Sequence, residues 1–264
     1  MNLSSICTRL ILLLGFSTYP LFSAEMVINK HGVHGYEDTP YLSWVPYRVH
    51  DNRRPKPQHV EAMPNLAAPP SDAIVLFDGR SMNQWDSSTT WKVENETLVT
   101  VEGALTSKAS FGDCQIHVEF MVPAEAPNKF TNRGNNGVGI MGLYEIQIFD
   151  SHPMHEKQLY ADGQCAAIYG ETPPLVNACR KPGEWQSFDI TFTAPVFEGD
   201  QLVSPAYVTV YHNGVLVHHH EKIHGPTLHR AIAPYKAHAP QLPLTFKGHG
   251  SPVAFRNIWV RPLN

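Results

Sequence analysis

Apolar and polar residues alternate with a period of two along much of the chain from Ile74 onward. The runs QIHVEFMV at 115–122 and SFDITF at 187–192 show the pattern most clearly. Such alternation is typical of strands that bury one face in a core and expose the other to water. No stretch of a dozen residues carries an apolar stripe at helical spacing. The sequence therefore predicts an all-β domain.

Turn signals divide this region into short strands. Asn213-Gly214 lies between two runs of β-forming residues within 207–219, and Asn-Gly suits the type I′ turn of a hairpin. A second hairpin is predicted across 91–100, with its turn at Glu94-Asn95-Glu96. Many short strands joined by Gly and Pro turns over roughly 190 residues favour a β-sandwich or jelly roll.

The residues before this domain have a different character. Arg9, an apolar run over 10–16 and small residues ending at Ala24 predict a signal peptide over 1–24. The apolar run is too short to span a membrane. Residues 25–71 are rich in proline, which disfavours helix and central strand, so they are predicted to form an extended arm before a domain over 72–264. We therefore expect a periplasmic or secreted protein without a membrane span.

Composition narrows the classes of function. Hydrophobic residues make up 42% of the chain and charged residues 17%, so a sizeable core can form. A net charge of −4 gives no electrostatic basis for nucleic-acid binding. Loss of the signal peptide would remove Cys7 and leave Cys114, Cys165 and Cys179. In an oxidising compartment we predict a disulfide between Cys165 and Cys179, with Cys114 as a buried thiol.

One strand carries a candidate pair of functional side chains. In LYEIQIFDSH at 143–152, Ile146 and Ile148 would face the core, so Glu145 and Gln147 would share the opposite face. A carboxylate beside an amide fits a grip on sugar hydroxyls or a general base with a partner, although a solvated strand face is the simpler interpretation. The preceding loop NRGNNG at 132–137 could position Arg133, or it could be only a turn.

Two further stretches are rich in glycine and small residues. YADGQCAAIYG at 160–170 offers two tyrosines that could stack on sugar rings, and its alternative interpretation is a tightly packed strand and turn. In FKGHGSP at 246–252, the flanking glycines leave Lys247 and His249 free to reach into a cleft.

Together these blocks resemble a known family. The matching motifs, in chain order, are LFDGRSMNQW at 76–85, RGNNGV at 133–138, YEIQIFDSH at 144–152, YADGQCAAIYG at 160–170, PPLVNACRKPGEWQSFDITFTAP at 173–195 and HGSPVAFRNIWVRPL at 249–263. They are similar to the 3-keto-disaccharide hydrolase domain family over about residues 72–264. The resemblance implies a concanavalin-like jelly-roll β-sandwich, and it does not extend to the arm.

The resemblance also implies an activity, the cleavage of small carbohydrates already oxidised at C3. A 3-ketone acidifies the C2 proton, so a base can remove that proton and the glycosidic oxygen on C1 can leave by β-elimination. Water then adds to the resulting enone, and the net result is hydrolysis. Such a site needs a base for C2, an electrophile for the enolate oxygen and an acid for the leaving group.

Carried onto the motifs of this chain, the resemblance suggests a role for each candidate residue. The candidates are Glu145 and His249 as base and acid, Arg133 or Lys247 as the enolate stabiliser, and Asn135, Gln147, Asp150 and Tyr169 as ligands of hydroxyl groups. A divalent cation could replace the cationic group, with Glu145, Asp150 and nearby histidines as ligands.

The last motif departs from the family pattern. Where related chains commonly read Gln-Asp-His-Gly, this chain reads Lys247-Gly248-His249-Gly250, which removes an orienting carboxylate and adds a positive charge. Two other functions stay open, because fold alone does not decide function. One is a non-catalytic, lectin-like carbohydrate-binding module, and the other is a structural envelope protein whose arm docks onto a partner.

Overall fold

The computed structural model describes residues 27–30, 34–35, 37–38, 46, 53 and 68–263, with gaps at 87–89, 101, 126–131, 156–160 and 230. The predicted signal peptide over 1–24 and most of the predicted arm lie outside the described residues. The chain divides into two units, 1–59 and 60–264. In the first unit, β1 (Val27–Ile28) and β2 (His34–Gly35) pair as antiparallel strands. No helix among the described residues is long and apolar enough to cross a membrane.

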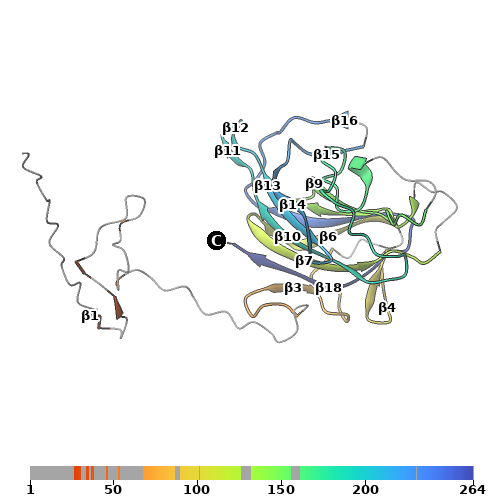
Figure 1. The fold of residues 1–264 in the computed structure, drawn as a ribbon, viewed down its shortest axis with the longest axis horizontal. Coiled ribbons are helices and arrows are strands. Elements are labelled where there is room, and N and C mark those ends of the chain that lie inside the picture. The colour runs from red at the N-terminus through yellow and green to blue at the C-terminus, as the bar shows by residue number, and fades with distance from the viewer. Residues whose placement is uncertain are drawn as a thin grey trace, which may run out of the picture. The chain divides into compact units, whose positions relative to one another are not determined.

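Two antiparallel sheets make up most of the second unit (Figure 1). The larger has eight strands in the order β14-β13-β10-β7-β18-β5-β4, with β3 paired to β18, and the smaller has four in the order β6-β17-β8-β9. The bounds of the larger sheet are β3 (Ile74–Phe77), β4 (Lys92–Glu94), β5 (Thr97–Val99), β7 (Cys114–Met121), β10 (Gln186–Thr193), β13 (Tyr207–His212), β14 (Val215–Lys222) and β18 (Ala254–Pro262). Those of the smaller are β6 (Glu102–Phe111), β8 (Asn136–Ile140), β9 (Tyr144–Ile148) and β17 (Leu242–His249).

Two further ladders and one short turn complete the described elements. β11 (Val196–Glu198) pairs with β12 (Gln201–Ser204), and β15 (Thr227–Leu228) pairs with β16 (Ala231–Ile232). A 3₁₀ turn spans Ala161–Gly163. The predicted all-β jelly-roll sandwich is confirmed.

The hydrophobic core lies between the two sheets. The alternating apolar residues of β7 and β10 point into it, as predicted, and meet Phe246 of β17 and Ile146 of β9 in one continuous cluster. Cys114 is fully buried, which confirms that part of the cysteine prediction, and burial raises the pKa of its thiol to about 12.

The two hairpins predicted from turn residues are confirmed. β13 and β14 are joined at Asn213 and Gly214, whose φ angles are 53° and 78°. β4 and β5 are joined at Asn95 and Glu96, with φ angles of 49° and 59°. Positive φ at both central residues is the signature of a type I′ turn, which suits the twist of paired strands.

Candidate functional site

The surface of the four-stranded sheet that faces away from the core carries most of the predicted site residues. Its central row runs from Thr245 on β17 through Gly139 on β8 to Glu145 on β9, which are paired across the sheet. In the next row, Gly137 on β8 pairs with Gln147 on β9. We call this surface the Glu145 face; its members are Gly137, Gly139, Glu145, Gln147, Tyr169, Thr245 and Lys247.

The predicted facing of β9 is confirmed, but its exposure to solvent is not. Ile146 and Ile148 lie in the core, whereas Glu145 contacts Lys247 on the other side of the sheet. Glu145 is only 7% exposed and Gln147 only 2%. The alternation indicated a solvated face, and the structure instead shows a covered one. A carboxylate removed from water needs partners, and these partners define the site.

Two glycines of β8 form the floor beneath those side chains. A Cβ atom added at Gly137 would overlap the carboxylate of Glu145, and one added at Gly139 would overlap the hydroxyl of Thr245. Because the middle strand carries no side chains here, polar groups from β9 and β17 can converge above it. The local sequence Asn-Gly-Val-Gly therefore suits both sides of the sheet: Val138 packs in the core, and the two glycines lie under the site on the opposite side.

Lys247 and Gln147 hold the carboxylate of Glu145 from two sides. Lys247 Nζ lies 3.3 Å from Glu145 Oε2, and its side chain is about one-third exposed. The side-chain amide of Gln147 lies 3.0 Å from Glu145 Oε1; with its nitrogen on that side, it donates to the carboxylate and to the carbonyl of Asn136. The other end of the same amide faces Asn135 at 3.1 Å. Four predicted residues, Asn135, Glu145, Gln147 and Lys247, thus form one connected group.

Tyr169 joins the site from an edge segment that extends the sheet. The Tyr169 amide donates to the carbonyl of Glu145, and Ile168 bridges to Ile146. Paired residues share a face, so Tyr169 stands beside Glu145. Its hydroxyl lies 2.8 Å from Nδ1 of His229, and the two rings stack at 6.4 Å. His229 did not emerge from the sequence, because it lies 60 residues from Tyr169 and belongs to no motif.

His249 lies at the rim rather than the centre. It is two residues beyond Lys247 on β17 and exposed, and its backbone carbonyl accepts a hydrogen bond from Asn132. Alternation places it on the same face as Lys247. The loop of Asn132 is further tied to the segment that follows β17 by a hydrogen bond from the Gly134 amide to the hydroxyl of Ser251.

Arg133 and Asp150 form a second group at the end of β9. Arg133 Nε lies 3.9 Å from Asp150 Oδ2, and the guanidinium lies 5.5 Å from the ring centre of Phe149. His155 Nε2 lies 2.5 Å from the same carboxylate oxygen. The sequence prediction missed His155, although the spacing DSHPMH at 150–155 was the available signal. Arg133 is thus placed against Asp150, rather than in the group around Glu145 and Lys247.

The predicted disulfide is absent from the structure, because Cys165 and Cys179 are both free thiols. They contact each other by a hydrogen bond, which lowers the pKa of Cys179, while burial raises that of Cys165. The thiol of Cys179 also donates to the carbonyl of Phe149 at 3.7 Å, and the Cys165 amide donates to Ser151. As thiols, the two cysteines support the end of β9 next to Asp150.

The option of a metal ion receives no support from the described side chains. Among them, no group of three or more His, Cys, Asp or Glu residues is arranged to hold an ion. The positive charge that lies next to the carboxylate of Glu145 belongs to the side chain of Lys247.

Comparison with known proteins identifies the family. Residues 72–261 match the model of the 3-keto-α-glucoside-1,2-lyase-like domain, the 3-keto-disaccharide hydrolase domain. The chain belongs to this 3-keto-disaccharide hydrolase family. Its similarity to a Parabacteroides distasonis protein, provisionally described as a glycosyl hydrolase, is 34% identity and a TM-score of 0.75, over 86% of this chain and all of the other.

Other solved structures agree on the fold of the 3-keto-disaccharide hydrolase domain. Two further Parabacteroides distasonis proteins with the same provisional description share 18% and 20% identity, each with a TM-score of 0.55. The matches cover 73% and 72% of this chain, and 94% and 99% of the other chains. A search of curated proteins found no match. The family membership makes this a carbohydrate-active domain.

Proposed function

We propose that the domain cleaves 3-keto-glycosides by removing the C2 proton, expelling the C1 oxygen and hydrating the enone. The observation that supports this most directly is the carboxylate of Glu145, held over a glycine floor against the Lys247 ammonium. A base and a cation on one small surface are what an enolate-forming reaction needs. The family description names 3-keto-α-glucosides, which fits the same chemistry.

Each step has a residue suited to it. Glu145 takes the C2 proton, and Lys247 stabilises the negative charge that develops on the C3 oxygen. The electron pair then forms the C1–C2 double bond as the bond from C1 to the leaving oxygen breaks. Water adds to C1, and C2 regains a proton, which yields the free 3-keto sugar and the released alcohol.

For the acid that protonates the leaving oxygen we propose Tyr169 in place of His249, the residue suggested by the family resemblance. Tyr169 stands beside Glu145 in the sheet, and its hydroxyl lies 2.8 Å from a ring nitrogen of His229, which can resupply a proton. His249 lies at the exposed rim, where it suits contact with the aglycone. Of the two predicted amides, half-buried Asn135 can bind a sugar hydroxyl, whereas buried Gln147, whose amide contacts Glu145, Asn136 and Asn135, serves to orient the Glu145 carboxylate.

The test is incubation of the purified protein with p-nitrophenyl 3-keto-glucoside and, in parallel, with the parent glucoside. We expect aglycone release from the 3-keto compound only, with exchange of the C2 proton in deuterated solvent, because the parent has no acidified C2 proton. Equal turnover of both would indicate a conventional two-carboxylate glycosidase. Saturable binding without turnover would favour the carbohydrate-binding alternative, and a parallel run with chelator tests the need for a metal.

A further inference from the structure

The surface of the eight-stranded sheet that faces away from the core carries a hollow of about 330 Å³, which no step of the proposed reaction uses. It lies over β7, β10 and β18. Its lining includes the indole of Trp185 and five charged or titratable side chains, Arg180 and four others that contact one another. We call it the His117 face, and its defining residues are His117, Glu119, Trp185, Asp189 and Arg256.

These side chains are fixed in place by the sheet register and by ion pairs. Asp189, His117 and Trp259 form one row across three strands, and Ser187, Glu119 and Arg256 form the next. His117 Nδ1 lies 2.6 Å from Asp189 Oδ1, and its ring stacks on Trp259 at 5.3 Å. Arg256 Nε lies 2.6 Å from Glu119 Oε2. A polar network held this firmly is preorganised, which lowers the entropic cost of binding a ligand.

The network still presents unused hydrogen-bonding groups to the hollow. The side chain of Asp189 is 42% exposed, and among the described residues only its Oδ1 has a hydrogen-bond partner. Arg256 bonds Glu119 through Nε alone, so within the same residues its two terminal NH₂ groups donate to nothing. His117 is only 3% exposed, and its Nε2 lies 3.7 Å from Glu119 Oε1, so this ring nitrogen is held within the network and the groups open to the hollow are those of Asp189 and Arg256.

This combination suits a saccharide. A carboxylate oxygen accepts from sugar hydroxyls and a guanidinium donates to them. The guanidinium of Arg256 is already oriented, because it stacks 4.0 Å from the ring centre of Trp185. An indole in the wall of the hollow also offers an apolar surface for the C–H face of a pyranose.

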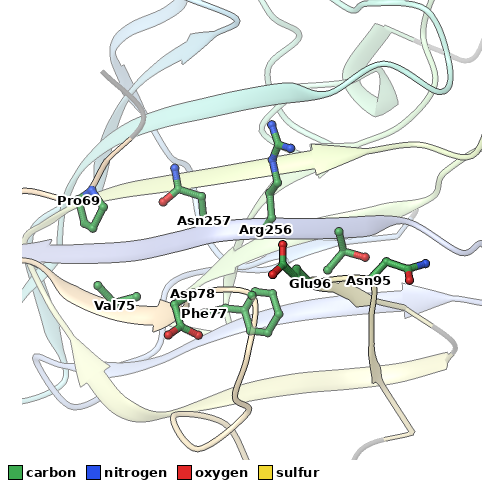
Figure 2. Close-up of a pocket in the computed structure, with 10 residues that line it drawn as sticks. Pro69, Val75, Phe77, Asp78, Asn95, Glu96, Arg256 and Asn257 are labelled. Atoms are coloured by element: carbon green, nitrogen blue, oxygen red, sulfur yellow. The ribbon is translucent and has the colours of Figure 1, made fainter. Parts of the chain in front are cut away.

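A second hollow of about 440 Å³ lies on the other side of Arg256. Figure 2 shows Arg256 and Asn257 rising from β18, with Asp78 on the neighbouring strand end and Asn95 and Glu96 at the hairpin turn. Arg256 extends away from Asp78 in this view. Arg256 lines both hollows, so its guanidinium can contact a ligand in either of them.

We propose that the His117 face is a second, non-catalytic saccharide-binding site that takes a neutral oligosaccharide. The two sheets pack core to core, so this face and the Glu145 face point away from each other. An oligosaccharide held at the first therefore leaves the second open. The inference goes beyond the proposed function and relies on it only for the choice of glucose oligomers as probes.

The experiment uses the full-length Glu145→Gln protein, so that binding is measured without turnover. Titration with maltoheptaose and with cellohexaose is followed by calorimetry, and by the indole N–H resonances of Trp185 and Trp259. We expect saturable binding of at least one of the two and a shift of these resonances. Trp185→Ala and Asp189→Asn should each weaken binding at least tenfold, whereas Thr191→Ala, on the same face of β10, should not.

Three outcomes would overturn the proposal. They are the absence of binding by both oligosaccharides, binding that leaves both indole resonances unmoved, and binding that Trp185→Ala and Asp189→Asn leave intact. The resonance measurement needs no variant of the face itself, so it stays decisive if one of the variants fails to fold. Loss of binding with intact 3-keto-glucoside turnover contradicts only this site, and the reverse result contradicts only the proposed reaction.

Discussion

The two outward surfaces of the sandwich differ in how their charged side chains are arranged. On the His117 face, charges sit on adjacent strands and pair within their rows, as His117 does with Asp189. On the Glu145 face, the strand between the charged residues carries only glycine, and Lys247 reaches Glu145 above it. The first arrangement locks the strands together. The second sets the carboxylate of Glu145 over a glycine of β8, in the room that a side chain on that strand would otherwise fill.

The comparison predicts that removing charge has its largest effect on rate at the Glu145 face. Glu145→Gln keeps the shape of the side chain and removes its basicity, so kcat on a 3-keto-glucoside should fall by about 10²–10⁴-fold. The melting temperature should change little, because glutamine fills the same space and the lysine that loses its charged partner is about one-third exposed and stays in contact with water. Steady-state kinetics and a thermal melt measure both effects.

A matched control is Glu198→Gln, which alters an exposed glutamate of β11 in the same way. It should keep the wild-type rate. If Glu145→Gln retained full activity, Glu145 would not be the base. If it unfolded the protein, Glu145 would serve mainly to hold the strands together, as the charges of the His117 face do.

The glycine floor gives the next largest effect. Gly137→Ala would push the Glu145 carboxylate out of place, and a shift of about 1 Å can cost on the order of 10²-fold in rate. We also expect a stability loss of about 1–3 kcal/mol from overpacking. Gly112→Ala is the control, because its Cβ would crowd the Pro240 carbonyl instead. Comparable rate losses in both variants would show that the floor has no specific role.

The sequence predicted the parts of this structure that local pattern determines. Alternation gave the facing of Ile146 and Glu145 correctly, and the turn residues located both hairpins. The pattern could not reveal that the Glu145 face is covered, because burial depends on segments distant in the chain. For the same reason it missed His229, and it offered Lys247 as a candidate without indicating that it pairs with Glu145, 102 residues away.

The cysteines and the His117 face also depend on contacts between distant segments, which local sequence pattern does not reveal. Loop length favoured a disulfide between Cys165 and Cys179, whereas the structure shows two thiols joined by a hydrogen bond. His117 and Asp189 were visible only as polar positions of two alternating strands. Their pairing depends on strand order, which the alternation of single strands does not specify.

The smallest expected effect is on the pH dependence of stability, which distinguishes two buried histidines, His117 with carboxylate partners and His212 without them. Burial alone lowers the pKa of His117, but hydrogen bonds to Asp189 and Glu119 raise it from 6.5 to about 9. The folded protein therefore binds this proton more tightly than the unfolded chain. This stabilisation is complete below pH 6.5 and is lost as the pH rises through 9. Burial lowers the pKa of His212 to about 3, so its contribution is lost as the pH falls from 6.5 toward 3.

Asp189→Asn tests this directly, because it removes the partner that raises the pKa of His117. In wild type, the free energy of unfolding should fall by about 1–3 kcal/mol between pH 6.5 and 9. The lower values of this range apply if water screens the ion pair, because the side chain of Asp189 is 42% exposed. In Asp189→Asn this alkaline decline should shrink, while the acid decline due to His212 stays. Asp200→Asn, in the exposed β11–β12 turn, should match wild type. Urea denaturation across this pH range gives the free energies, and an unchanged alkaline slope in Asp189→Asn would refute the assigned role of the His117–Asp189 pair.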